Sequence, residues 1–423
     1  MQQETFTILL ICAGFLLADF YLIGGIRAGL KKWKFTQKRS FTIAYWVISI
    51  LFTGGVFISV FFKMGLGVRA AFLLGFFLMA FAKVLFLPFI LADDVRRLII
   101  WFSRRSKKSS PIIQPGPAIP RSEFLMKAGL LAGSIPLATL TYGTIRGVYD
   151  YRVKHRTLYL PNLPKAFDGI KLGQISDIHS GSFYNKKAVL GGVEMLLKEK
   201  PDFIFFTGDL VNRRTSEMNG YQDIFSKVKA PLGVYSSLGN HDYGDYYDWP
   251  DEAAKQKNMA DLITTHKNMG WDLLLNTNRR LKVDGEEIGI LGVENWGTIA
   301  RFPRRGRLDL ATKDTDDLPV KLLLSHDPSH WRAQVLPHYP QIDAMFAGHT
   351  HGMQFGIRTE HFQWSPVQYI YKEWAGLYHE GPQQLYVNVG YGFLGYPGRL
   401  GILPEITIFE LKAGPDPSLK NRA

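Results

Sequence analysis

Long apolar runs dominate the first part of the chain. Three of them, at residues 6–24, 41–62 and 70–91, are close to the roughly 20 residues that a helix needs to cross a bilayer. A fourth run, at 124–144, is less apolar and carries Lys127 and Pro136, so it is either a fourth span or a helix that lies on the membrane. The pattern predicts an α-helical membrane region over residues 1–156 with three or four transmembrane helices.

From about residue 157 the pattern changes to short apolar runs that alternate with segments of helical periodicity. The apolar runs include GIKLGQIS, DFIFFTG, VKLLLS and IDAMFAG, and helical periodicity marks residues 186–200 and 251–270. This alternation is typical of a layered α/β domain. We therefore expect an α/β domain over residues 157–412, followed by a C-terminal tail at 413–423.

The positive charge of the chain is confined to the first part. Residues 1–156 contain 21 basic and 6 acidic side chains, a net charge of +15, whereas residues 157–423 contain 29 basic and 31 acidic ones. Binding to nucleic-acid phosphates requires clustered Lys and Arg, so no nucleic-acid partner is expected for the second part. The charge distribution indicates a membrane protein instead.

The basic links between the apolar runs predict the orientation of the chain. Links rich in Lys and Arg tend to stay in the cytoplasm, and those at 27–40 and 92–123 carry six and seven such residues. Four spans then place the second part outside the cytoplasmic membrane, and three place it inside. The fourth run follows RSEFLMKAG, which resembles a twin-arginine export signal that lacks one arginine. We expect a multi-pass protein of the cell membrane with an extracytoplasmic second part.

Two charged residues, Asp19 and Lys83, lie inside the apolar runs. Charges within a membrane are candidate functional sites. A single Asp and a single Lys can also pair with each other or extend to the interface, and this second interpretation is preferred. No functional role is predicted for them.

Five apolar runs of the second part end in turns that are rich in metal-binding side chains. The turns are SDIHSG, GDLVN, GNHD, SHDP and GHTHG. One such turn is weak evidence, because Asp and His are common in ordinary turns. All five follow predicted strands, and loops at the carboxyl ends of strands converge on binding crevices in α/β sheets. Together they predict a single site.

The residue types in these turns indicate a metal centre. Cys12 is the only cysteine, so a thiolate site is excluded, and carboxylate, amide and imidazole ligands suit divalent Mn, Zn, Fe, Co or Ni. The candidates are too many for one ion and fit two divalent ions that share a bridging carboxylate. They are Asp177, His179, Asp209, Asn240, His326, His349 and His351.

The motifs Asp-x-His, Gly-Asp, Gly-Asn-His-Asp, His and Gly-His-x-His resemble those of the calcineurin-like metallophosphoesterases. With the closing VNVGYGFLGYPGRLGILPEITIFEL, they are similar to a membrane-associated or exported bacterial branch of that family. The resemblance covers about residues 157–412, not the membrane region, and implies a layered β-sandwich flanked by helices. It also implies that one ion is held by Asp177, His179, Asp209 and His351, and the other by Asp209, Asn240, His326 and His349.

The resemblance gives His241 the role of a general acid that protonates the leaving oxygen. In many relatives an Asp three residues after the bridging Asp supports this histidine, and here Asn212 stands at that position. A side-chain amide can orient His241 but cannot stabilise its positive charge. Asp242 is the candidate to compensate.

The resemblance implies a metal-dependent phosphoesterase in which metal-activated hydroxide attacks phosphorus. A membrane anchor favours a phosphorylated lipid or small molecule of the cell envelope as substrate, and we expect a phosphodiester or pyrophosphate bond rather than a monoester. The alternative is a membrane sensor or binding module whose domain recognises phosphate without catalysis. The complete ligand set favours the enzyme.

Two clusters outside the five turns leave alternatives open. The loop RFPRRG, with Arg301, Arg304 and Arg305, could contact lipid headgroups or an anionic substrate, or could simply be solvated. Arg399 and Glu405 lie in the closing segment, where we expect them to close the fold rather than to bind substrate.

Overall fold

The computed structural model describes residues 2–62, 66–106, 120–359 and 361–417. The chain divides into two compact units, the first ending at Tyr142 and the second beginning at Gly143. Part of the predicted C-terminal tail, residues 418–423, lies outside the described residues. Each unit is considered by itself.

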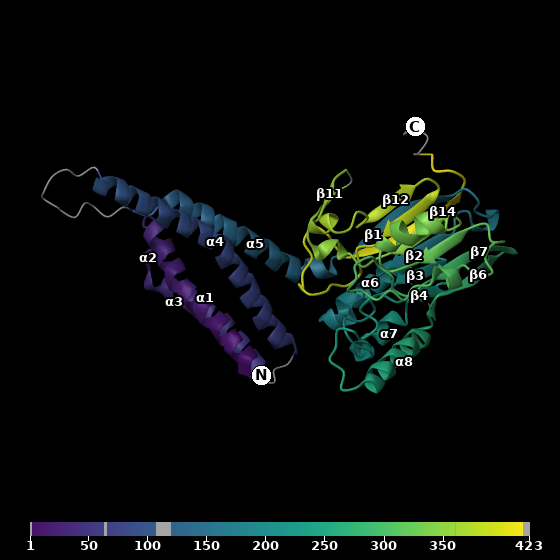
Figure 1. Cartoon of the computed structure of the whole chain (residues 1–423), viewed down its shortest axis with the longest axis horizontal. Coiled ribbons are helices and arrows are strands. Elements are labelled where there is room, and N and C mark those ends of the chain that lie inside the picture. The colour runs from purple at the N-terminus through teal and green to yellow at the C-terminus, as the bar shows by residue number, and fades with distance from the viewer. Residues whose placement is uncertain (1, 63–65, 107–119, 360, 418–423) are drawn as a thin grey trace. The chain divides into compact units, whose positions relative to one another are not determined.

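The first unit is helical, and four of its described helices are long and apolar enough to cross a membrane. The fourth apolar run forms one continuous helix in spite of Pro136. The helices are α1 (Gln2–Gly29), the short α2 (Lys34–Gln37), α3 (Arg39–Phe61), α4 (Leu66–Ser106) and α5 (Glu123–Ile145), as Figure 1 shows.

Helix α4 extends well beyond the apolar run that predicts it. The run ends at residue 91, but the helix continues through a charged segment to Ser106. Asp93 pairs with Arg96 at 2.8 Å and Asp94 with Arg97 at 3.1 Å. Residues three apart lie on the same face of a helix, so these pairs support the charged continuation.

Helix α5 packs closely against α4 through two glycines on one face. A Cβ atom at Gly129 would lie 2.3 Å from the ring of Phe86, and one at Gly133 would lie 2.8 Å from the carbonyl oxygen of Ala82. Small residues four apart allow helix backbones to approach each other in a membrane. The sequence AGLLAGS is therefore a packing motif of α5.

The residues before α5 are also fixed to α4. Arg121, from the segment that resembles an export signal, lies 3.4 Å from a carboxylate oxygen of Asp93 and 3.0 Å from one of Asp94. The backbone N–H of Ser122 donates to Asp93 at 3.0 Å. Arg121 thus has a structural role at the start of α5.

Asp19 and Lys83 form an ion pair inside the helical unit. Lys83 Nζ lies 2.7 Å from Asp19 Oδ1, and the side chain of Asp19 is fully buried. The hydroxyl of Tyr45 donates to Asp19 at 2.6 Å, and Ser49 donates to its other oxygen. The pair joins α1, α3 and α4, and it agrees with the structural interpretation of these two charges.

Lys83→Met should destabilise the helical unit, because it leaves the buried carboxylate of Asp19 without its counter-ion. Removing one partner of a buried pair costs about 3–5 kcal/mol, so the midpoint of thermal unfolding in detergent should fall clearly. Lys127→Met removes a partially exposed pair with Glu123 and serves as the control, since such pairs contribute about 0–1 kcal/mol. Equal effects of the two substitutions would contradict a supporting role of the buried pair.

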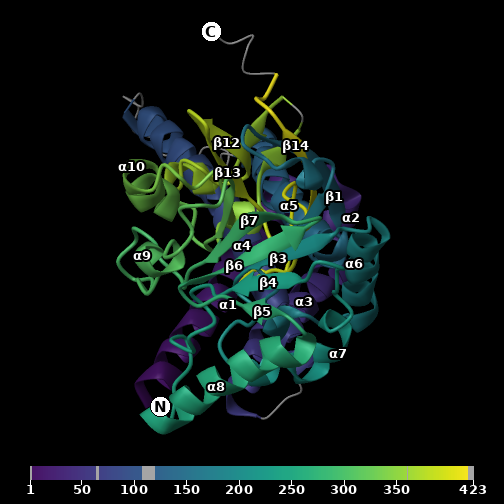
Figure 2. The ribbon, with the colours of Figure 1, turned by 90° about the vertical axis from the view of Figure 1, so that its right-hand side faces the viewer.

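The second unit contains two six-stranded sheets, which Figure 2 shows. The first has the order β1 (Arg152–Leu160), β14 (Glu405–Ala413), β2 (Lys171–Ile175), β3 (Phe203–Thr207), β4 (Val234–Ser237) and β5 (Asp272–Leu273). The second has the order β12 (Gly376–Glu380), β13 (Gln383–Val387), β9 (Ala344–Ala347), β8 (Lys321–Leu324), β7 (Glu286–Gly292) and β6 (Thr277–Val283). A separate antiparallel pair is formed by β10 (Ile357–Arg358) and β11 (Gln363–Trp364).

The two sheets face each other across an apolar core. Phe205 of β3 meets Phe346 of β9 with ring centroids 5.1 Å apart, whereas Ile204 and Phe206 point to the opposite face of their sheet. Helices cover both outer faces: α6 (Lys186–Lys198), α7 (Gln222–Phe225) and α8 (Glu252–Met269) on the first sheet, and α9 (Leu308–Ala311) and α10 (Leu336–His338) on the second. The layered β-sandwich flanked by helices is confirmed.

Strand β1 is an element that the sequence pattern does not reveal. Its sequence RVKHRTLYL is strongly polar, and its first residue, Arg152, lies before the boundary expected after residue 156. The strand pairs in parallel with β14 along its whole length, from Arg152 opposite Glu405 to Leu160 opposite Ala413. Pairing with a strand from the end of the chain, rather than its own periodicity, fixes it in the sheet.

Candidate metal centre

The five polar turns lie at the carboxyl ends of five parallel strands. Strands β2, β3 and β4 are neighbours in the first sheet, and β8 and β9 are neighbours in the second. Each turn begins within a few residues of the end of its strand. Because the two sheets are packed face to face, the turns of both meet at one edge of the sandwich.

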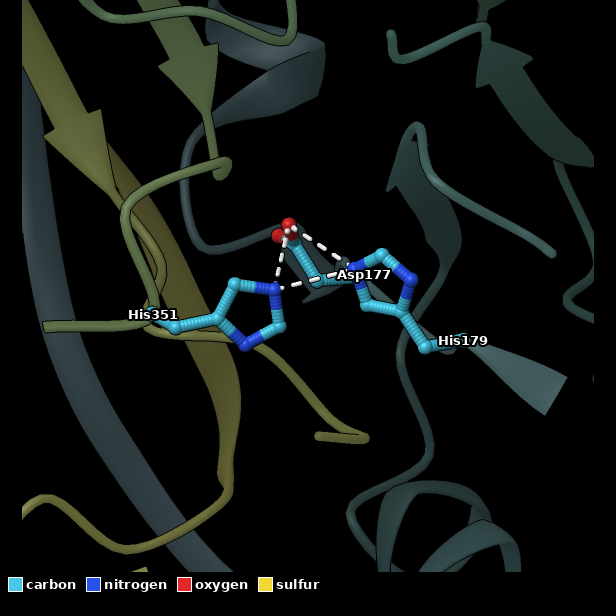
Figure 3. A group of neighbouring side chains, drawn as sticks. All are labelled: Asp177, His179 and His351. Atoms are coloured by element: carbon cyan, nitrogen blue, oxygen red, sulfur yellow. Dashed lines mark hydrogen bonds and ion pairs between the residues drawn. The ribbon is translucent and has the colours of Figure 1, made fainter. Parts of the chain in front are cut away.

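The first group of ligand atoms comes from Asp177, His179 and His351, all buried, and these atoms lie within 4.8 Å of one another. The Nε2 atoms of the two imidazoles are 3.0 Å apart. Nε2 of His351 is 3.2 Å from a carboxylate oxygen of Asp177. Figure 3 shows the three side chains pointing toward a common centre.

The second group of ligand atoms comes from Asp209, His326 and His349, and these atoms also lie within 4.8 Å of one another. Nε2 of His326 lies 3.1 Å from Oδ2 of Asp209 and 3.3 Å from Nδ1 of His349. Oδ2 of Asp209 is also 3.5 Å from Nε2 of His179, in the first group. Asp209 therefore lies between the two groups.

Most of these ligands have an unusual backbone conformation. Asp177, His179, Asp209, His349 and His351 have φ between 49° and 70°. This left-handed region is uncommon for residues other than glycine and is costly to hold. The tight turns direct successive side chains into the same small volume.

Electrostatics favour charged carboxylates in the centre. Burial alone would raise the pKa of Asp177 and Asp209, but the surrounding imidazoles hold both below the usual value of a carboxyl group. Burial lowers the pKa of His179 and His349, which keeps these two rings neutral. His326 differs, because burial lowers its pKa but Asp209 and Asp177 together raise it to about 10, so this ring has to release a proton when it binds a cation. Ionised carboxylates and neutral imidazoles are the forms that bind cations.

Two observations test whether the residues fit divalent cations. Nε2 of His179 and Nε2 of His351 face each other at 3.0 Å, and a cation would use the lone pairs of both nitrogens. The side-chain oxygen of Asn240 is buried without a hydrogen-bond partner among the described residues, while its nitrogen donates to the hydroxyl of Tyr246 at 2.9 Å. An amide oxygen and imidazole nitrogens are suitable ligands for such ions, so the residues fit.

Asp242 has a different place from the one that sequence analysis gives it. Its carboxylate accepts the backbone N–H groups of Asp209, Leu210, Val211 and Gly239, at 2.8–3.3 Å. Burial raises its pKa, as does the neighbouring Asp209. Because both oxygens are occupied by the main chain, Asp242 is a positioning residue that fixes the turn carrying Asp209, and it does not support His241 directly.

His241 is oriented by Asn212, but through the main chain. Its Nδ1 lies 2.7 Å from the carbonyl oxygen of Asn212, whereas the side-chain amide of Asn212 donates to Ser182. The backbone N–H of His241 donates to Asp209 at 2.8 Å. With Nδ1 donating to a carbonyl, Nε2 is the ring nitrogen that is free to carry a proton toward a substrate.

Two residues next to the ligands, Tyr371 and Asp327, are not among those predicted from the sequence. The hydroxyl of Tyr371 lies 2.8 Å from Nε2 of His349 and 3.4 Å from a carboxylate oxygen of Asp327. Such outer contacts orient imidazole ligands. Asp327 directly follows His326 in SHDP and could have been suspected, whereas Tyr371 lies in an irregular segment with no motif.

Arg399 combines closure of the fold with a contact to a ligand. The side chain is buried, donates to the carbonyl oxygens of Val389 and Gly392, and places Nη2 3.2 Å from Nδ1 of His351. Glu405, in contrast, pairs with Arg358 away from the ligands. Both residues were expected to close the fold, but only Arg399 reaches the centre.

Comparison with known proteins identifies the family. The family profile "Calcineurin-like phosphoesterase" matches residues 170–353, and the profile "Probable Calcineurin-like phosphoesterase, transmembrane domain" matches residues 3–148. The chain belongs to the calcineurin-like phosphoesterase family. It is thus a metallophosphoesterase and a membrane protein, and the similarity extends to the membrane region that sequence analysis left without a relative.

Individual relatives agree with this assignment. The metallophosphoesterase YkuE of Bacillus subtilis is 28% identical over 301 residues, which cover 69% of this chain and 98% of YkuE. A zebrafish (Danio rerio) transmembrane protein with a metallophosphoesterase domain is 27% identical over 67% of this chain and 62% of its own length. The metallophosphoesterase Cj0846 of Campylobacter jejuni is 28% identical over 62% and 63% of the two chains. The family implies divalent metal ions at the centre.

If each group holds its own ion, His349→Ala and His351→Ala should each retain about one ion per chain, against about two in the parent. Adding Asp177→Asn to each of these variants shows which of the two groups has lost its ion. The pair Asp177→Asn/His351→Ala should still retain one ion, because both changes affect the first group, whereas Asp177→Asn/His349→Ala should retain none.

The measurement is metal analysis by mass spectrometry of the purified full-length protein after dialysis. His330→Gln is the control, since His330 is buried nearby but bonds to Ser325 and Gln334. Loss of both ions in each single variant would contradict the division into two groups.

Proposed function

We propose that this protein is a membrane-anchored phosphoesterase that uses two divalent ions to hydrolyse a phosphodiester or pyrophosphate bond of a lipid or another cell-envelope substrate. The observation that carries the proposal is the position of Asp209, whose Oδ2 lies 3.5 Å from His179 and 3.1 Å from His326. A carboxylate in contact with both groups is suited to bridge two ions. Such a pair of ions, when bound, supplies a water of lowered pKa and positive charge for the phosphoryl oxygens.

Different residues of the chain would bind the two ions and protonate the leaving group. Asp177, His179 and His351 would hold one ion, Asn240, His326 and His349 the other, and Asp209 both. His241 would protonate the leaving oxygen from Nε2, because Nδ1 is occupied by the carbonyl of Asn212.

We further propose that the catalytic unit lies outside the cytoplasmic membrane. The described helices include four that are long enough to span, and the most basic links, at 27–40 and 92–123, would then be cytoplasmic. An enzyme held at the membrane surface meets lipid and envelope substrates at a raised effective concentration. This placement supports the proposed class of substrate.

His241→Ala should lower kcat by about 10²–10⁴-fold with substrates whose leaving group needs a proton. The loss should be much smaller with p-nitrophenolate, which leaves without one. The test compares phenyl and p-nitrophenyl phosphodiesters, with Mn²⁺-loaded full-length protein in detergent. Asp209→Asn should lose turnover of both, and His155→Ala, an exposed surface change, should lose neither.

An equal loss for the two leaving groups in His241→Ala would contradict the general-acid role. A parent protein that binds phosphate but turns over no ester would favour a phosphate-recognising module instead of an enzyme.

Topology can be tested with reporters fused after residue 150, just before β1. Alkaline phosphatase fused there should be active and green fluorescent protein dark, because four spans from a cytoplasmic first link end outside. Fusions after residue 106, in the third link, are the matched control and should give the reverse pattern. Fluorescence of the fusion after residue 150 would place the catalytic unit in the cytoplasm.

A further inference from the structure

The segment after β7 forms a loop that is closed on itself beside the metal centre. The side-chain amide of Asn295 donates to the carbonyl oxygen of Pro303 at 2.8 Å, and the backbone carbonyl of Asn295 accepts the backbone N–H of Arg305 at 2.9 Å. The backbone N–H of Thr298 donates to the hydroxyl of Ser329 at 2.9 Å, in the segment that follows His326. The loop is therefore held in place against the centre.

Three of the four arginines in this loop have structural partners. Arg304 donates to the carbonyl oxygens of Gly297 and Thr298. Arg305 stacks over the ring of Tyr243, with 4.4 Å between guanidinium carbon and ring centroid, and Arg307 pairs with Asp309 at 2.6 Å. Two of the three arginines of RFPRRG, Arg304 and Arg305, are therefore engaged by the protein itself.

Arg301 is the exception. Its side chain is exposed, and within the described part of the chain no hydrogen bond or ion pair is recorded for it. Its guanidinium lies 4.7 Å from the ring centroid of Phe302. Phe302 is buried and meets the ring of His349 edge-on, with centroids 4.8 Å apart. Arg301 is thus stacked on the residue that packs against a proposed ligand.

The packing of Phe302 shows which half of the centre Arg301 faces. The guanidinium of Arg301 lies over the ring of Phe302, and that ring meets His349. The ring of His349 is in turn 5.1 Å from that of His326, measured between centroids. Arg301 therefore lies close to the half of the centre that contains His326 and His349.

An exposed guanidinium without a protein partner is available to an anion, and a centre that collects cations attracts anions to the same place. Guanidinium groups bind phosphate through two parallel hydrogen bonds. We propose that Arg301 binds a second phosphate of the substrate, adjacent to the phosphorus under attack, and that the preferred bond is therefore a pyrophosphate linkage. This inference rests on the proposed function and narrows its substrate class.

In the corresponding hydrolysis, water adds across one P–O bond of the P–O–P bridge. The attacked phosphorus gains the oxygen of the water, and the bridging oxygen leaves with the second phosphate, which Arg301 holds. The leaving oxygen takes its proton from His241, and one proton of the water passes to solvent. The products are two phosphate monoesters.

The test compares Arg301→Gln with Arg307→Gln, a change in the same loop at an exposed, paired arginine. The full-length protein is assayed in nanodiscs of zwitterionic lipid with P1,P2-diphenyl pyrophosphate and with diphenyl phosphate. Arg301→Gln should lower kcat/KM for the pyrophosphate by about 10- to 100-fold, the value of a charge-assisted contact, and change the diester little. Arg307→Gln should change neither.

A binding measurement keeps the inference separate from turnover. Imidodiphosphate, which is not hydrolysed, should raise the unfolding midpoint of the parent more than inorganic phosphate does, and Arg301→Gln should abolish that difference. If the parent cleaves neither ester, the proposed function fails, and this measurement still decides the role of Arg301.

Equal losses for both esters would assign Arg301 to the reacting phosphate and overturn the inference. So would an effect that appears only in nanodiscs of anionic lipid and for both esters, because Arg301 would then contact lipid headgroups. An unchanged response to imidodiphosphate in Arg301→Gln would also overturn it.

Discussion

The organisation of the catalytic unit depends on one buried carboxylate, that of Asp209. A buried negative charge is tolerated only when it is compensated, and here imidazoles from both sheets approach one oxygen, while the backbone of His241 donates to the other. Asp242 in turn binds the backbone N–H groups around Asp209. Holding this charge in place brings the ends of two sheets together, and the same arrangement makes a site for cations.

The membrane unit also contains a buried carboxylate whose charge is compensated by neighbouring side chains. Asp19 is buried among apolar helices and is compensated by Lys83, Tyr45 and Ser49. Arg121 adds ion pairs with Asp93 and Asp94 at the start of α5, and close packing at Gly129 and Gly133 joins the rest of α5 to α4. Charges are therefore placed where they cross-link helices, in keeping with the high cost of an unpaired charge in a membrane.

The sequence predicts the strands that end in the five polar turns, because each of these strands is a short apolar run and each turn follows one directly. Contacts made by the main chain cannot be predicted from residue types, so the contact of His241 with the carbonyl oxygen of Asn212 was not expected. The same holds for Tyr371, which lies in no motif, and for β1, whose place depends on a strand over 240 residues away. Arg399 and Glu405, which receive the same interpretation from the sequence, are distinguished only by their contacts, because Arg399 lies next to His351 and Glu405 pairs with Arg358.

The most direct test of the central claim is X-ray diffraction from crystals of the full-length protein loaded with Mn²⁺, measured at the manganese absorption edge. We expect two anomalous peaks, one within ligand distance of Asp177, His179 and His351 and one within ligand distance of Asn240, His326 and His349, with Asp209 in contact with both. A single peak, or peaks that Asp209 does not bridge, would contradict it.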